Sequence, residues 1–588
     1  MLLSSKGRTV KALTRKTKRL FKKSTEHVEE ELIGNVDNAY LVRSRIVGWL
    51  LAMAGLVFLA GVQYLWYQNS YSTNAFAAGG VYAEATLGKV STLNPLYAST
   101  NSELVASKLL FSGLFRYDTS GHLIGDLARS LKVSDGGKTY TVELRDDAKW
   151  HDGKPVLAKD VEFTVKTIQD ARSRALSRSG LEEVKVERVG DRSVKFTLPA
   201  AYLAFTDVLT FAILPEHLLG KVEPGLIYES EFSAKPVGSG PFKFQLNQSL
   251  KGDGAIIHLV KNVDYYGGSA KLDRMQVHAM SSQKDIARSL KNGETSATAD
   301  LSRAYKNELL GGSIYLREAA INRGVYAFMN TTNPVLKDLK VRRAVQLSVD
   351  TANVRASLGT DITALDTPIL ANQIDASLPS APKVDKAESQ KLLESAGYTK
   401  KDGKLLGSDG KQASLKLVAI DEGDYKKVAD ALAVELSQMG FKIEKDIVDV
   451  SGKGKDFLRE VLQPRNYDIL VYEIGLGADP DVFAYWHSSQ ANEGGFNLSN
   501  YSNTVVDDIL ASARTSQNQS LRQVKYKSFV SRWLKDVPAI GIYQVQTQYY
   551  YNKNVRTFGE DVKLVSSIDR FSDVLYWAAT KKEVYQTP

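Results

Sequence analysis

Apolar and polar positions between residues 139 and 168 predict a strand, a turn and a helix in succession. Apolar residues first alternate with polar ones, the period of a half-buried strand, at Tyr140, Val142 and Leu144. Gly153 and Pro155 then interrupt the extended run and indicate a turn. Beyond the turn, apolar residues recur at helical spacing at Ala158, Val161, Val165 and Ile168. Strand, turn and helix are generic parts, so this pattern alone names no function.

The same two periods alternate through most of the chain. Strand-like runs fall at Val184–Val189, Val194–Leu198, Ile256–Val260, Leu415–Ile420, Tyr467–Tyr472 and Ile540–Gln544. Helix-like runs are interleaved with them, at Ser102–Phe111, Val341–Val349, Lys386–Ser395, Tyr425–Met439 and Leu521–Leu534. Interleaving of this kind indicates an α/β class with mixed sheets.

One run is different, because Ile46–Tyr67 is almost entirely apolar and carries no charge. As a helix it would be about 33 Å long, enough to cross a bilayer, with aromatic residues near its ends where an aromatic belt would lie. The alternative is a buried core helix, which is rarely so long and free of charge. We therefore expect a transmembrane helix at 46–67, followed by a polar linker at 68–80.

Positive charge is concentrated before this run. Residues 1–45 hold eleven Lys or Arg and five Asp or Glu, so this tail supplies +6 of the chain's net charge of +9. Such a tail is expected in the cytoplasm, with the C-terminal body extracellular or periplasmic. The tail fits either a helix lying on anionic lipid or a disordered basic segment. Ala75-Phe76-Ala77 has the pattern of a cleavage site and leaves a removed signal peptide as the alternative to a retained anchor.

Length and composition narrow the function classes further. At 588 residues the chain is too long for one core, so two or more domains are expected. The absence of cysteine excludes disulfides, thiol catalysis, Cys-ligated metal and a lipid anchor on cysteine. The body beyond the tail is not strongly basic, so nucleic-acid binding is not expected.

Motifs for catalysis or metal binding are incomplete or missing in the sequence. There is no HExxH pair, P-loop, complete GxGxxG or EF-hand loop, and Gly238-Ser239-Gly240 fits a close-packed turn better than a nucleophile elbow. His151, His217 and His487 are expected to be surface or satisfied core residues. We therefore expect no enzyme activity, no cofactor and no metal site. The abundant tyrosines suit either strand packing or the walls of a cleft that holds a solute.

The order of residues carries a family resemblance. LRDDAKWHDGKPVLAKDVEFT, residues 144–164, resembles a segment of the peptide/nickel-type solute-binding proteins of bacterial ABC importers. Further blocks follow in the family's order, among them STLNPLYAST (91–100), PVGSGPFKF (236–244), MNTTNPVLKDLKVRRAVQLSVD (329–350) and YDILVYEIGLGADPDVFAYW (467–486). The family usually has Thr or Ser where this chain has Leu157, so the following helix lacks a side-chain cap and is expected to be weaker by about 1 kcal/mol.

The resemblance implies a two-lobed α/β fold of the periplasmic-binding-protein (Venus flytrap) type with an extra inserted domain. The first lobe would combine residues 81–120, 233–325 and 541–580, and the inserted domain would span 121–232. The second lobe would span 326–540.

The resemblance also points to a ligand site around Tyr472–Trp486. In peptide binders of this family, a strand here holds the peptide backbone and an aspartate holds its free α-amine. Leu476 stands at that aspartate's position, and Asp479 keeps a later acidic position that we interpret as mainly structural. A buried ammonium would lack a counter-charge, so acetylated peptides are expected to bind at least as well as free ones. The candidate ligand-binding residues are Tyr97, Tyr472, Gly475, Leu476, Gly477, Asp479, Trp486 and Tyr543.

The expected function is therefore that of a membrane-anchored solute receptor of an ABC importer, with a peptide as the favoured solute. Its partners would be permease and ATPase subunits, since the chain has no ATP site, and its outer body would be monomeric. Two other classes remain open. One is a ligand-binding sensor or surface interaction protein without transport, and the other is a hydrolase of extracellular peptides, for which the sequence offers no catalytic constellation.

Overall fold

The computed structural model describes residues 43–176, 180–250, 254–359, 361–375, 377–450 and 456–585. Nearly all of the predicted basic tail, residues 1–45, lies outside the described residues. The chain divides into two compact units, one made of residues 1–75 with 581–588 and the other of residues 76–580.

The described part of the first unit is dominated by one long helix, α2 (Arg43–Tyr71). Its segment Arg43–Gln68 is long and apolar enough to cross a membrane. The predicted span 46–67 lies inside it. The predicted linker at 68–80 differs from expectation, because the helix continues to Tyr71 and is followed by β1 (Ser72–Ala77), which pairs with β20 (Thr580–Tyr585).

Ten strands of the described chain form one continuous sheet in the second unit, in the order β17-β16-β18-β13-β19-β12-β2-β11-β10-β9. Their bounds are β2 Val81–Leu87, β9 Phe242–Ser249, β10 Ala255–Lys261, β11 Arg274–Met280, β12 Ala297–Thr298, β13 Ile314–Met329, β16 Ser414–Ile420, β17 Lys442–Val448, β18 Ile469–Gly475 and β19 Ala539–Asn552. Smaller sheets are built from β3 (Phe115–Tyr117) with β4 (Leu123–Gly125), from β14 (Thr399–Lys401) with β15 (Lys404–Leu406), and from β5 (Ala128–Ser134), β6 (Thr139–Leu144), β8 (Ser193–Thr197) and β7 (Lys185–Arg188).

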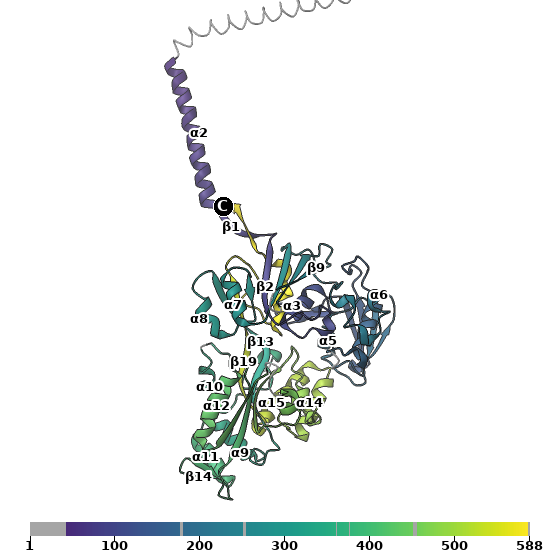
Figure 1. Ribbon diagram of the computed structural model, residues 1–588, viewed down its shortest axis with the longest axis vertical. Coiled ribbons are helices and arrows are strands. Elements are labelled where there is room, and N and C mark those ends of the chain that lie inside the picture. The colour runs from purple at the N-terminus through teal and green to yellow at the C-terminus, as the bar shows by residue number, and fades with distance from the viewer. Residues whose placement is uncertain are drawn as a thin grey trace, which may run out of the picture. The chain divides into compact units, whose positions relative to one another are not determined.

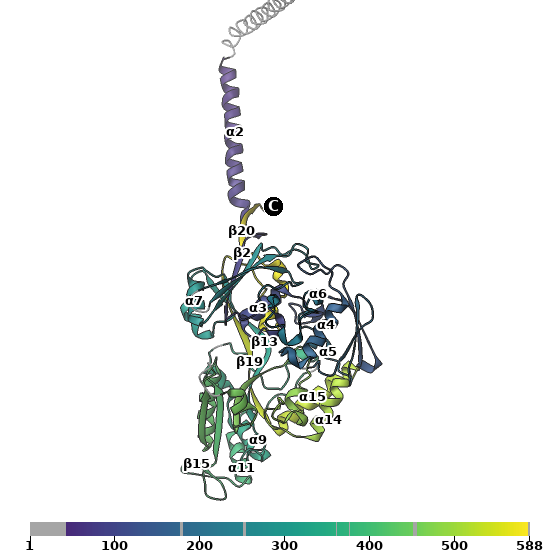
Figure 2. The same ribbon diagram turned by 45° about the vertical axis from the view of Figure 1, so that its right-hand side comes forward.

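The α-helices of this unit surround the sheets (Figure 1, Figure 2). They are α3 Asn101–Leu110, α4 Ala158–Gln169, α5 Phe205–Val208, α6 Glu216–Leu219, α7 Gln283–Lys291, α8 Lys306–Leu309, α9 Leu339–Ser348, α10 Thr351–Ala356, α11 Lys386–Ser395, α12 Tyr425–Met439, α13 Phe483–Trp486, α14 Thr504–Thr515 and α15 Gln519–Asp536. Each strand-like and helix-like run predicted from the sequence coincides with one of these elements to within a few residues, except at β19, which continues well past the predicted end. The mixed α/β class is thereby confirmed.

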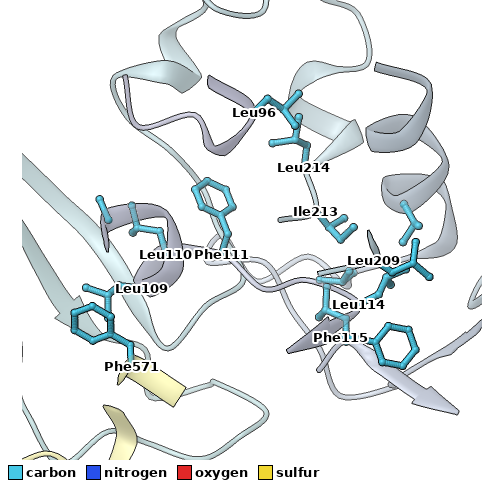
Figure 3. Packing of buried hydrophobic residues seen from close by; sticks show 14 of the residues in the cluster. Leu96, Leu109, Leu110, Phe111, Leu114, Phe115, Leu209, Ile213, Leu214 and Phe571 are labelled. Atoms are coloured by element: carbon cyan, nitrogen blue, oxygen red, sulfur yellow. The ribbon is translucent and has the colours of Figure 1, made fainter. Parts of the chain in front are cut away.

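A first large core joins both ends of this unit. It contains buried residues from Tyr82 to Ala297 and again from Tyr549 to Trp577, and we call the region packed around it the first lobe. Figure 3 shows Phe571, from the C-terminal 3₁₀ helix η10 (Ser567–Tyr576), beside Leu109 of α3. The same view places Leu96 beside Leu214, so distant segments share this core.

A second region, which we call the second lobe, has a core on each face of its part of the sheet. Along β13, Val325, Ala327 and Met329 pack on one face with residues of α9, α10, α11 and α12. The alternate residues Tyr326 and Phe328 pack on the other face with residues of α13, α14 and α15. This is the period of two in a strand that is buried on both faces.

Two long antiparallel strands, β13 and β19, pass from one lobe to the other (Figure 1). Their register shifts between Ala320 and Gly324 and again between Val325 and Tyr326, where the strands leave the first lobe. A Cβ atom at Gly541 would lie 2.2 Å from the carbonyl oxygen of Leu365, so only glycine lets that segment cross the strand. Because the pairing of β13 and β19 is irregular where they pass between the lobes, the lobes can bend relative to each other there.

The first lobe contains the two local features singled out in the sequence. Leu157 begins α4 without a side-chain cap, but Asp160, fully buried, accepts hydrogen bonds from the backbone N–H groups of Leu157 (2.8 Å) and Glu216 (2.9 Å). The turn at Gly238 is close-packed as predicted, since a Cβ atom there would lie 1.8 Å from the carbonyl oxygen of Leu110. His151 is a satisfied residue beside this turn: its Nδ1 accepts from the Gly238 N–H at 3.1 Å.

Candidate functional site

A cavity of about 340 Å³ lies between the two lobes, beside the strands that connect them, and we call it the hinge cleft. The first lobe contributes Leu87, Asn101, Gln283, the segment Ala299–Arg303 and Ser567. The second lobe contributes Ile362, the segment Glu422–Tyr425 at the start of α12, and Glu473 of β18. Residues Tyr543–Gln548 of β19 connect the two sides.

Carboxylates dominate the second-lobe wall of the hinge cleft. Glu473 forms an ion pair with Arg323 at 2.8 Å. Burial and the adjacent Glu473 raise the pKa of Tyr425 well above its ordinary value, so this tyrosine stays a neutral donor. Asp424, the residue before α12, lies 3.2 Å from Lys427 in the first turn of that helix.

The first-lobe wall combines a buried acid with a neutralised arginine. Asp300 accepts hydrogen bonds from the backbone N–H of Leu87 (2.7 Å) and the side-chain amide of Asn101 (3.0 Å). Burial raises the pKa of Asp300 to about 6. Arg303 is held by Glu318 at 2.9 Å, so its charge is balanced inside the first lobe.

Of the eight residues proposed from the sequence, only Tyr543 lies among the described residues that line the hinge cleft. Tyr472 and Gly475 flank Glu473 on β18, and the Tyr472 ring stacks 6.4 Å from that of Tyr425. These positions place the β18 end of the predicted site beside the cleft.

The next predicted residues belong to the interior of the second lobe. Leu476 is 2% exposed within the α13–α15 core, and its N–H donates to the carbonyl of Asn322 at 2.8 Å. Trp486 is fully buried in the same core. Gly477 adopts a left-handed φ of 65°, and its carbonyl accepts from the Asn322 side chain at 2.7 Å.

Asp479 is held by a bidentate ion pair. Its two carboxylate oxygens lie 2.5 and 2.7 Å from the guanidinium of Arg522, whose side chain is 6% exposed. This geometry agrees with the interpretation of Asp479 as a structural acid.

Tyr97 lies in the first lobe, at the end of the 3₁₀ helix η1 (Pro95–Tyr97). It is 8% exposed and packs edge-to-face on Tyr228 with ring centroids 5.2 Å apart. A ligand contact by Tyr97, as by the other seven residues, stays a prediction.

Sequence reasoning missed most of the groups that line the hinge cleft. Asp300, Glu422 and Asp424 fall in loops and at helix starts, where an acidic residue is more often a turn or cap residue. Nothing local distinguishes them from other carboxylates of this chain. Their common feature is their position around one cavity, which sequence periodicity cannot report.

A second cavity of about 480 Å³ lies within the first lobe, among α3, β3, η10 and the Tyr265-Tyr266 pair. Among its charged groups, Lys108 lies 3.4 Å from Asp569 and Arg116 3.6 Å from Asp126, and Arg145 pairs at 2.9 Å with Asp147 outside the lining. Among the described residues, no group of three or more His, Asp or Glu side chains is placed to hold a metal ion.

The lobes also touch at a point away from the connecting strands. The guanidinium of Arg514 on α14 lies 4.4 Å from the ring of Tyr202, in the first lobe, and 4.4 Å from that of Phe483, in the second. The Leu203 N–H donates to the Arg514 carbonyl at 3.2 Å. This inter-lobe contact can form only when the two lobes are close together.

Known proteins resemble the chain in both sequence and fold. Residues 122–495 match the family model for bacterial extracellular solute-binding proteins, family 5. The oligopeptide-binding protein AppA of Bacillus subtilis is 28% identical over 519 residues, covering 85% of this chain and 92% of AppA.

Solved structures extend the comparison. NikZ of Campylobacter jejuni, in complex with Ni(L-His), has a TM-score of 0.70 at 27% identity and covers 85% of this chain and 99% of NikZ. AppA of B. subtilis, in complex with a nonapeptide, has a TM-score of 0.68 at 25% identity and covers 86% of this chain and 100% of AppA. These matches show a two-lobed periplasmic-binding-protein fold, and the chain belongs to family 5 of the bacterial extracellular solute-binding proteins.

Proposed function

We propose that this chain is a membrane-anchored receptor that captures a peptide between its two lobes and delivers it to an ABC permease. A substrate-binding role follows from the family. The observation that carries the proposal is the hinge cleft, a cavity bounded by both lobes beside the two strands that connect them. Closure of the lobes over a solute would change the surface that the protein presents to a permease.

A peptide is the favoured solute on two grounds. The B. subtilis AppA relative is named an oligopeptide-binding protein, and its structure holds a nonapeptide. Among the described residues, β16 pairs with Ile469 and Leu470 of β18 and no strand pairs with the later residues of β18 on that side, where β18 ends beside the cleft. A strand edge of this kind can hydrogen-bond an extended peptide.

The anchor and its orientation are part of the same proposal. Helix α2 would span the membrane, the basic tail would lie in the cytoplasm, and residues 81–580 would lie outside the cell or in the periplasm. The outer body would be monomeric, would act without catalysis and would follow the domain boundaries given above for the two lobes and the inserted domain.

The experiment is ligand identification on the full-length chain. The protein is extracted from membranes in mild detergent, and native mass spectrometry detects what co-purifies with it. We expect bound peptides that are displaced by a synthetic peptide mixture. Exclusive recovery of a non-peptide solute would overturn the peptide proposal, and release of the chain by carbonate washing without detergent would overturn the anchor.

A further inference from the structure

The charge around the hinge cleft is unbalanced. Among the described residues that line it, four carboxylates, Asp300, Glu422, Asp424 and Glu473, face one guanidinium, Arg303. Arg303 is matched from outside the lining by Glu318, and two of the acids are matched in the same way, Glu473 by Arg323 and Asp424 by Lys427. The two carboxylates left without an ion pair among the described residues are Asp300 and Glu422. Within the described part of the chain, Glu422 has no basic side chain at ion-pair distance, and Asp300 is held by neutral donors only.

A second and independent observation concerns neutral oxygens on β19. Gln548 and Thr547 both line the cleft and are 9% and 6% exposed. The side-chain amide oxygen of Gln548 and the hydroxyl of Thr547 have no hydrogen-bond partner among the described residues. A buried amide oxygen that accepts no hydrogen bond is costly, so the Gln548 side chain lacks a donor on this wall of the cleft.

Both observations call for the same chemistry. Carboxylates and an amide oxygen only accept hydrogen bonds, while an ammonium or a guanidinium only donates them and carries the opposite charge. Tyr543 also lines the cleft, and an aromatic ring can stabilise a cation placed over its face. An anionic group would instead be repelled by Asp300 and Glu422, which no basic side chain among the described residues offsets.

We propose that the hinge cleft binds a cationic group of the ligand, an alkylammonium or a guanidinium, between Asp300 and the Glu422–Asp424 segment. The inference rests on the proposed function, because it names the class of solute that the same cleft prefers. Closing the lobes would bring the two acidic walls together around the cation, and the cation would thus stabilise the closed arrangement.

The cation has two possible sources in a peptide, a Lys or Arg side chain and the free α-ammonium. Matched pentapeptide amides separate them. Three are N-acetylated, of the form Ala-Ala-X-Ala-Ala, with Lys, norleucine or Glu at X. A fourth carries norleucine with a free amine. The diamine 1,5-diaminopentane serves as a cation that is not a peptide.

Binding is measured by calorimetry on the full-length chain in detergent at pH 7. The test variant is Glu422→Gln with Asp424→Asn, two positions on the cleft rim whose side chains are not in a core. The matched control is Glu493→Gln with Asp508→Asn, which removes the same charge from exposed positions of the same lobe that do not line the cleft.

We expect the acetylated Lys peptide to bind at least ten-fold more tightly than the norleucine and Glu peptides. The test variant should lose this preference and the control variant should keep it. If the free-amine norleucine peptide shows the preference instead, with the same dependence on the test variant, the α-ammonium is the source. Equal binding of all four peptides, or a preference that survives in the test variant, would overturn the inference.

The two proposals fail separately in this design. One outcome is that the diamine binds, that none of the peptides binds, and that the test variant no longer binds the diamine. This would support the cation site and overturn the peptide function. Binding of peptides without a preference for a cation would support the peptide function and overturn the cation site. An absence of binding by every probe would overturn both.

Discussion

At the scale of single residues, the neighbours of a carboxylate or an imidazole decide its role. Asp479 is neutralised by Arg522 and holds α15 in place, whereas Glu422 faces the cleft without a basic partner among the described residues. His151 accepts a backbone hydrogen bond, which requires a neutral imidazole. Each of these assignments leads to a measurable consequence of substitution or of pH.

Leu476→Asp should destabilise the protein strongly. Leu476 is 2% exposed in an apolar core, and a carboxylate there would be buried without a counter-charge, at a cost of at least about 3 kcal/mol. Urea denaturation measures the change, with Leu521→Asp as the control because Leu521 is 48% exposed in the first turn of α15. Unchanged stability would mean that the position 476 side chain faces the cleft, as the family resemblance implies.

Acid should destabilise the fold through His151. Burial lowers the pKa of His151 to about 4, so between pH 6.5 and pH 4 the unfolded chain binds a proton that the folded chain does not. The stability contributed by the neutral form is therefore complete above pH 6.5 and is lost as the pH falls towards 4, by about 2 kcal/mol at pH 4.5.

The comparison is between the wild type and His151→Gln, each unfolded by urea at pH 7 and at pH 4.5. We expect the variant to lose less stability on acidification. Other titrating groups, such as Asp300, are common to both proteins and cancel in the difference. His122→Gln is the control, since the side chain of His122 is 79% exposed. An equal loss in all three proteins would contradict the assignment.

At the scale of elements, local sequence sets where helices and strands begin. Where a local start signal is weak, hydrogen bonds to residues distant in sequence can stabilise the start instead. Helix α4 begins at Leu157 without a side-chain cap, yet the buried carboxylate of Asp160 accepts from the N–H before the helix. The same carboxylate accepts from Glu216, so the start of α4 is fastened to the start of α6. One acid thus performs both a local and a tertiary function.

Leu157→Thr should stabilise the protein modestly. A threonine hydroxyl at this N-cap can accept a backbone N–H of the first turn, for a gain of about 0.5–1 kcal/mol. Leu157→Ala, which removes the side chain without adding an acceptor, should give no gain. Thermal unfolding of the wild type and the two variants measures the change in stability. If the alanine variant gained as much stability as the threonine variant, the cap would not be the cause.

At the scale of the whole molecule, the second unit is organised by strands that both lobes share. β13 and β19 carry the sheet from one lobe to the other, and the hinge cleft lies beside the stretch that contains both of their register shifts. The lobes meet again where Arg514 lies between Tyr202 and Phe483. A solute in the cleft and this distant contact should therefore favour the same closed arrangement.

Arg514→Ala should weaken solute binding although Arg514 does not line the hinge cleft. Losing the contact with Tyr202 makes the closed arrangement less populated, which reduces the apparent affinity. A double-mutant cycle with Tyr202→Ala, read by calorimetry with a solute that the wild type binds, should give a coupling of about 0.5–1 kcal/mol. Additive effects of the two substitutions on affinity would show that the contact does not contribute to closure.

The sequence by itself determined the mixed α/β class, many of the helices and strands of the folded body, the apolar helix and the family. The spacing of apolar residues, the turn residues and the order of the family-like blocks are properties of the linear sequence. They can therefore be recognised without knowing which residues pack together. It did not predict β1, because that strand exists only through pairing with β20 from the other end of the chain.

Only the tertiary structure decided which residues surround the hinge cleft. Asp300, Glu422 and Glu473 are far apart in sequence and share no motif, and the long strands β13 and β19 bring them together. It also decided that Leu476 and Trp486 lie in a core, since burial depends on what packs against a side chain from elsewhere. A strand's period predicts that one face is buried, but the partner on that face, whether core or solute, is set by the folding of the whole chain.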